Sequence, residues 1–100
     1  MPIPKKHLDE LYALLMKAKT SKDMRLLLAD LLTPKERATV AERLQLVQML
    51  MSGTPQRTIA KTLKMSISKV TRGSLALKVS KGGFRKFIPK KSASKKRVAR

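Results

Sequence analysis

The sequence predicts an all-α fold, a helix-turn-helix domain of about six helices, because two features recur along most of its 100 residues. Apolar residues are spaced three or four apart in several segments, as one face of a helix requires. Ser, Thr and Pro stand where these segments begin, at positions that cap or start helices. The domain is expected to cover residues 1–88. Residues 89–100 lack apolar periodicity and are expected to form a basic, disordered tail.

Two helices are predicted in the first third of the chain. The first should run from Lys5 to about Lys19, with leucines at positions 8, 11 and 15 on one face. The second begins near Ser21, which can cap it, and carries Leu27, Leu28 and Leu31. Each has an apolar face that needs to be covered by another element.

A third, central helix should run from Pro34 to about Ser52. Thr33 and Glu36 have the spacing of a capping box, and Gly53 is well placed to end the helix. Its apolar residues spread over several faces: Val40, Leu44, Val47 and Met51 on one stripe, Leu46, Met49 and Leu50 on others. This arc is too wide for one neighbour, so we expect a two-fold dimer in which a second copy covers part of it. The alternative is a helix packed wholly within one monomer.

Residues 54–78 have the pattern of a helix-turn-helix. Thr54 and Pro55 can cap and start one helix, and Ser66 can cap the next. The buried positions between the two helices are predicted to be Ile59, Ala60, Leu63, Met65 and Val70.

The second of these helices exposes short polar and cationic groups that suit a DNA groove: Ser68, Lys69, Thr71 and Arg72. An ordinary helical hairpin with a solvated face is the alternative. Two residues depart from the usual motif. Lys64 stands at the turn, where a left-handed conformation would cost it about 1 kcal/mol, and Gly73 stands inside the helix, where an apolar core residue is expected. Something beside Gly73 is therefore expected to need room.

After this motif, Gly82 and Gly83 interrupt the pattern, and a short turn is expected to dock Phe84 and Phe87 before Pro89 ends it. The net charge of +18 is uneven, because residues 56–100 carry fifteen Lys and Arg and no acidic residue. Such a block favours a polyanionic partner, and double-stranded DNA fits the predicted motif. The tail is expected to neutralise phosphates; a merely solubilising role is the alternative.

Several other classes of protein are disfavoured. There is no cysteine, and His7 is the one histidine, which leaves no predicted metal site. No paired carboxylates, nucleophile with a base, or phosphate-binding loop is recognisable, so an enzyme is not expected. An RNA-binding protein is disfavoured because the three aromatic residues occupy core spacings. The chain lacks a long apolar run or a signal peptide, so no membrane partner and a cytoplasmic location are expected.

Residues 31–78 resemble the tryptophan repressor family of bacterial transcription regulators. The resemblance is carried by LLTPKER, AERLQLVQMLMSG, QRTIAKTL and above all VTRGS followed by LALK. It implies an intertwined homodimer that binds operator DNA when L-tryptophan occupies a pocket beside each recognition helix.

The resemblance also implies a set of ligand contacts. Arg43 and Arg72 would clasp the indole, since guanidinium groups stack on aromatic faces and pair with carboxylates. Thr33 would help to hold the carboxylate, and Gly73 would leave space for the ligand. Ala76 stands where the family has a serine, which removes one hydrogen bond worth about 1 kcal/mol. The backbone carbonyls near Asp30 and Leu32 remain as acceptors for the ammonium. A related indole, or an empty site, is the alternative.

For DNA, the resemblance implies contacts from both helices of the motif. Ile67, Ser68 and Thr71 match positions near base edges, and Gln56 and Arg57 match positions near the backbone. Lys69 replaces a small hydroxyl residue and can reach a phosphate or a guanine. A ligand-independent or nucleoid-type DNA-binding protein remains the second hypothesis.

Overall fold

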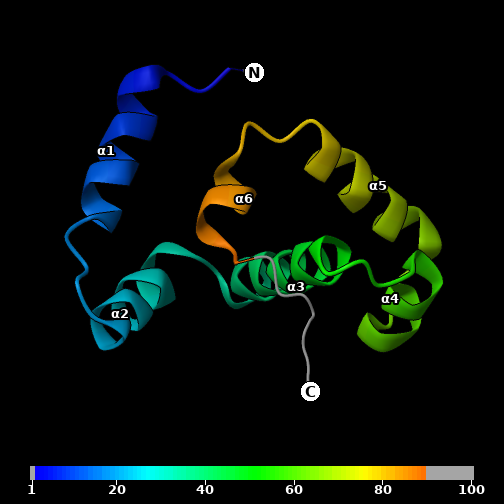
Figure 1. Ribbon diagram of the computed structural model, residues 1–100. Helices are drawn as coiled ribbons and strands as arrows, with labels where there is room; N and C mark the ends of the chain where they lie inside the picture. The colour runs from blue at the N-terminus through cyan, green and yellow to red at the C-terminus, as the bar shows by residue number, and fades with distance from the viewer. Residues whose placement is uncertain (1, 90–100) are drawn as a thin grey trace. The chain divides into compact units, whose positions relative to one another are not determined.

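The computed structural model describes residues 2–89, which contain six helices and no strand (Figure 1). The helices are α1 (Lys5–Leu15), α2 (Ser21–Leu31), α3 (Pro34–Met51), α4 (Gln56–Leu63), α5 (Ile67–Lys78) and α6 (Gly83–Phe87). The predicted all-α fold is confirmed. The chain divides into two compact units, Met1–Ala38 and Thr39–Arg100. The expected tail, apart from Pro89, lies outside the described residues.

In the first unit, two helix ends differ from the sequence prediction. α1 ends at Leu15, four residues early, because the amides of Lys17 and Ala18 bond to carbonyls only three residues back. The cap of α2 is Thr20, not Ser21: the Thr20 backbone is extended and its hydroxyl accepts a hydrogen bond from the Asp23 amide at 3.0 Å. The prediction of a Ser21 cap was wrong by one residue.

Neither α1 nor α2 contains a buried residue. Tyr12, Leu14 and Met16 near the first helix, and Leu26 and Leu31 on the second, are exposed. Amphipathic helices of this length are marginal in water unless their apolar face is packed. The leucines predicted on these two faces are half-buried except Leu31, so within the first unit the cover that the sequence predicted is only partial.

The turn before α3 is fixed by local hydrogen bonds. The Glu36 amide donates to the Thr33 hydroxyl at 3.1 Å, and the Thr33 amide donates to the Glu36 carboxylate at 2.8 Å. This is the predicted capping box. The Arg37 guanidinium adds bonds to the carbonyls of Ala29 and Leu32, which ties the end of α2 to the start of α3.

At its other end α3 stops in the way the sequence predicted. Gly53 has a φ of 84°, its amide bonds to the Leu50 carbonyl, and the Thr54 amide bonds to the Met49 carbonyl. These two bonds form a Schellman motif. They also explain why Thr54 does not cap α4 as expected: its hydroxyl lies 3.3 Å from that of Ser52, and the N-cap is Pro55, without a side-chain bond.

The core of the second unit lies where α3, α4 and α5 meet (Figure 1). Ile59 and Val70 are fully buried, Leu46 is nearly so, and Met49, Leu50, Ala60, Leu63 and Met65 pack around them. The predicted interior of the helix-turn-helix is confirmed. Val40 and Leu44, in contrast, are 50% and 41% exposed. Of the stripe predicted on α3, only Val47 is buried.

Lys64 adopts the left-handed conformation at the end of α4, with φ 54° and ψ 49°. The Met65 amide then bonds to the Ala60 carbonyl, so α4 ends in the way that usually places glycine at the left-handed position, here with Lys64 instead.

α6 docks differently from the expectation. Phe84 is half-buried, but Phe87 is 77% exposed, so the predicted docking of Phe87 is wrong. α6 is held instead by Arg85, whose guanidinium donates to the Leu77 carbonyl at 3.3 Å. No helix in the described part of the chain is long and apolar enough to cross a membrane.

Candidate ligand pocket and DNA-facing helix

α5 presents its polar face to solvent. Its first turn is fixed by Ser66, whose hydroxyl accepts from the Lys69 amide at 3.1 Å. Val70 points into the core, which turns Ser68, Lys69 and Thr71 outward, and all three are exposed. Ile67 at the start of the helix is also exposed. These four residues and Arg72, which is exposed as well, are the α5 residues that the sequence suggested for DNA contact.

The start of α4 is joined to this face by one side-chain hydrogen bond. The Thr71 hydroxyl donates to the Gln56 side-chain oxygen at 3.1 Å. Gln56 is half-buried and Arg57 beside it is exposed. The bond brings together the two helix positions that were expected to contact bases and backbone.

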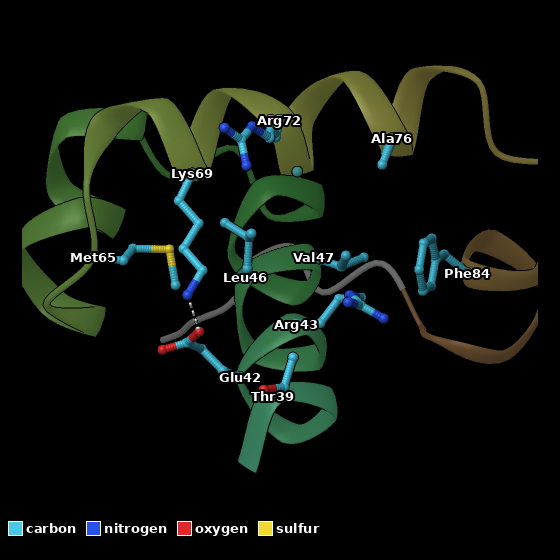
Figure 2. A pocket seen from close by; sticks show the side chains of 11 residues that line it. Thr39, Glu42, Arg43, Leu46, Val47, Met65, Lys69, Arg72, Ala76 and Phe84 are labelled. Carbon is cyan, nitrogen blue, oxygen red and sulfur yellow. Dashed lines mark ion pairs between the residues drawn. The ribbon is translucent and has the colours of Figure 1, made fainter. Parts of the chain in front are cut away.

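A pocket of about 490 Å³ lies in the second unit between α3 and α5. Figure 2 shows its walls: Arg43 projects from α3 toward Phe84, and Leu46 lies between α3 and α5. The lining residues are Thr39, Glu42, Arg43, Leu46, Val47, Met65, Lys69, Arg72, Gly73, Ala76 and Phe84. Aliphatic groups and one aromatic ring form much of the wall, and charged groups stand among them. Such a lining suits a ligand with an apolar body and charged ends.

α5 lies close to Leu46 of α3 at Gly73. A Cβ atom placed there would lie 2.4 Å from Leu46 Cδ2 and 3.0 Å from Leu46 Cγ. Leu46 is buried, so it has little room to move away. The room that Gly73 was expected to provide is therefore taken up, in this structure, by a core leucine.

An ion pair links the two helices at the edge of the pocket. Lys69 Nζ lies 3.0 Å from Glu42 Oε1, and their side chains are 56% and 36% exposed (Figure 2). Sequence reasoning missed Glu42. One signal was available: Glu42 is the only acidic residue from residue 39 to the end of the chain.

The family described as Trp repressor protein matches residues 6–92. The chain belongs to this family. It is 43% identical over 65 residues to a Trp operon repressor homolog of Mannheimia succiniciproducens, covering 64% of each chain. A protein of the same name from Actinobacillus succinogenes is 44% identical over 59 residues, 58% of each chain. One from Chlamydia trachomatis serovar L2 is 43% identical over 56 residues, 55% of this chain and 60% of that protein.

The matched part thus spans less than two thirds of the length of these relatives. No solved structure matches the chain.

The structure brings together three of the four ligand-contact residues suggested by the resemblance to the Trp repressor family. Arg43, Arg72 and Gly73 line one pocket, and Ala76 lines it too. Thr33 lies in the first unit, where its hydroxyl and amide form the capping box. Among the described residues, no group of three or more His, Asp or Glu could hold a metal ion.

Proposed function

We propose that this protein is a sequence-specific, DNA-binding transcriptional repressor that acts as a homodimer and uses L-tryptophan, or a related small molecule, as co-repressor. Membership of the Trp repressor family and relatives named Trp operon repressor homolog support a regulatory role. In this role the protein is not an enzyme, and double-stranded operator DNA is its partner.

DNA binding is supported by the chemistry of α5 and the start of α4. Ser68, Lys69 and Thr71 are exposed on a helix anchored by buried Val70 and Leu77. Short hydroxyl side chains can bond to base edges directly or through water, and Lys69 and Arg57 can neutralise phosphates. Two such helices in a two-fold dimer would meet successive major grooves about 34 Å apart.

Ligand binding is supported by the two arginines of the pocket. Arg43 comes from α3 and Arg72 from α5, and both line the same 490 Å³ space. Planar guanidinium groups stack on an aromatic ring and also bind a carboxylate. An aromatic carboxylate such as L-tryptophan has both groups.

The observation that carries the proposal is that one helix, α5, both lines the pocket and exposes polar side chains to solvent. α5 supplies Arg72 and Gly73 to the pocket and exposes Ser68 and Thr71 to solvent. A ligand held by Arg72 is therefore in direct contact with the helix that reads DNA, so it can alter the population of the DNA-binding conformation.

Calorimetry with L-tryptophan and selection from random DNA duplexes, with and without L-tryptophan, test this function. Arg72→Ala should weaken ligand binding at least tenfold, because it removes one face of the clasp and a charged hydrogen bond. Arg57→Ala is the matched control: Arg57 does not line the pocket, so this variant should keep its ligand affinity and bind DNA more weakly. If Arg72→Ala leaves the ligand affinity unchanged, the pocket assignment is wrong.

A second candidate is a ligand-independent DNA-binding protein. It is favoured by the packing of Leu46 against Gly73 and by Ala76, which offers no side-chain hydrogen bond. Under this alternative, the same selection yields a preferred site that does not depend on L-tryptophan, and no heat of binding is measured.

We also propose that residues 89–100, beyond a domain of residues 1–88, add sequence-independent affinity. Their six cationic residues are Lys90, Lys91, Lys95, Lys96, Arg97 and Arg100. Phosphate contacts of this kind strengthen binding to all DNA and make it sensitive to salt.

A further inference from the structure

Glu42 is chemically unlike the rest of the pocket. It is the one acidic side chain in a lining that includes three cations, Arg43, Lys69 and Arg72. Its carboxylate is paired with Lys69 at 3.0 Å and is 36% exposed. A ligand whose only charged group is a carboxylate would not need Glu42, because the three cations already attract that carboxylate.

An amino-acid ligand has a second requirement, an acceptor for its ammonium group. An ammonium has three donors and no acceptor, and leaving it unpaired beside two arginines would cost free energy. Ala76, which lines the pocket, has no acceptor in its side chain. Glu42 is the negatively charged acceptor that the pocket itself provides.

We propose that Glu42 is a specificity-determining residue that accepts the ammonium group of an aromatic amino acid and thereby gives up its ion pair with Lys69. This inference rests on the proposed function, because it concerns the ligand of that same pocket. It makes Glu42 the residue that distinguishes a zwitterionic amino acid from an aromatic carboxylate without an amino group.

The exchange has a consequence for DNA binding. Lys69 lies on the exposed face of α5, between Ser68 and Thr71, and its ammonium is held by Glu42. When the ligand takes over Glu42, Lys69 is free to turn toward a phosphate. Ligand binding and DNA binding are then coupled through one exchanged ion pair, and each strengthens the other.

The first test measures ligand selectivity in the full-length protein. Dissociation constants for L-tryptophan and for indole-3-propionate, which lacks the amino group, are compared between wild type and Glu42→Gln. Gln keeps the shape and removes the charge. Wild type should prefer L-tryptophan, and this preference should fall about tenfold or more in Glu42→Gln. The ammonium of L-tryptophan loses the Glu42 carboxylate, and the carboxylate of indole-3-propionate can then pair with Lys69.

Asp9→Asn is the matched control. It removes the same charge from the 3.0 Å ion pair between Lys5 and Asp9 in α1, and it should leave the preference unchanged. Lys69→Met provides a second variant with the opposite expectation: it frees Glu42, so the preference for L-tryptophan should rise. An unchanged preference in both pocket variants, or a wild type that binds the two ligands equally well, overturns the role of Glu42. A wild type that binds neither refutes the proposed ligand as well, so the two failures are distinguishable.

The second test measures the affinity for a selected DNA duplex without ligand. Glu42→Gln should bind about three- to tenfold more tightly than Asp9→Asn, although both variants gain one unit of net positive charge. Adding Lys69→Met to Glu42→Gln should abolish this gain, because the gain comes from Lys69. Equal affinities of Glu42→Gln and Asp9→Asn, with circular dichroism showing equal helix content, would overturn the release of Lys69.

Discussion

At the scale of single residues, the contact between Gly73 and Leu46 gives the sharpest expectation for stability. Gly73→Ala places a methyl group 2.4 Å from Leu46 Cδ2. Overpacking of this kind costs about 1–3 kcal/mol, whereas alanine in a helix gains about 1 kcal/mol over glycine. Because Leu46 is buried, we expect the steric cost to exceed the gain, with a net loss of about 1 kcal/mol in the free energy of unfolding, measured by urea denaturation.

A double-mutant cycle separates this contact from other effects of the methyl group. Leu46→Val removes both Cδ atoms, so Gly73→Ala should cost little or even stabilise in that background, through its better helix propensity. If the two substitutions are additive, the space beside Gly73 is not limited by Leu46. The need for a glycine there would then have another cause, for which the ligand is the leading candidate.

Residue-scale features differ in how far the sequence predicted them. The capping box of Thr33 and Glu36, the Ser66 cap and the Gly53 terminus are confirmed, because each depends on residues within a few positions. The pair between Glu42 and Lys69 joins residues 27 positions apart. Whether these two side chains meet depends on how α3 and α5 cross, which the spacing of residues along the chain does not determine.

At the scale of elements, the turn of the helix-turn-helix stores strain at one residue. Lys64 is exposed and left-handed, a conformation that costs a residue with a Cβ atom about 1 kcal/mol. Lys64→Gly should therefore raise the free energy of unfolding by about 0.5–1 kcal/mol, which corresponds to a rise of several degrees in Tm. Thermal unfolding followed by circular dichroism measures it.

Lys61→Gly is the control, because it makes the same replacement of lysine by glycine three positions earlier. Lys61 is exposed inside α4, so glycine there should lower stability by about 1 kcal/mol. If the free energy of unfolding rises in Lys64→Gly and falls in Lys61→Gly, the difference is due to the backbone conformation of the two residues. If both variants lose stability, the Lys64 side chain contributes something that outweighs its strain.

The elements also show where sequence reasoning stops. Helix positions are well predicted, since apolar spacing and caps are local signals, and the interior of α4 and α5 follows from the same spacing. Which apolar residues are buried is predicted less well. Val40, Leu44 and Phe87 share the periodicity of core residues yet are exposed, because burial depends on which neighbour is present rather than on the pattern itself.

At the scale of the whole molecule, the proposed homodimer would give the exposed apolar residues a role. α1 and α2 contain no fully buried residue, and α3 exposes Val40 and Leu44 in its first half. Exposed apolar residues that lie together on a surface often mark a protein–protein interface. The proposed homodimer would cover these residues, and folding and association would then be a single process.

Coupling of folding to association makes stability depend on concentration. For a dimer that folds on association, Tm should rise with protein concentration, whereas the Tm of a monomer does not change.

Leu44→Glu should weaken the dimer strongly, because it would bury an unpaired carboxylate in an apolar contact. Gln45→Glu adds the same charge at the next, exposed residue and should leave the dimer largely intact. Sedimentation equilibrium of the three proteins measures the difference. A wild-type protein that sediments as a monomer, with a Tm independent of concentration, would contradict the dimer.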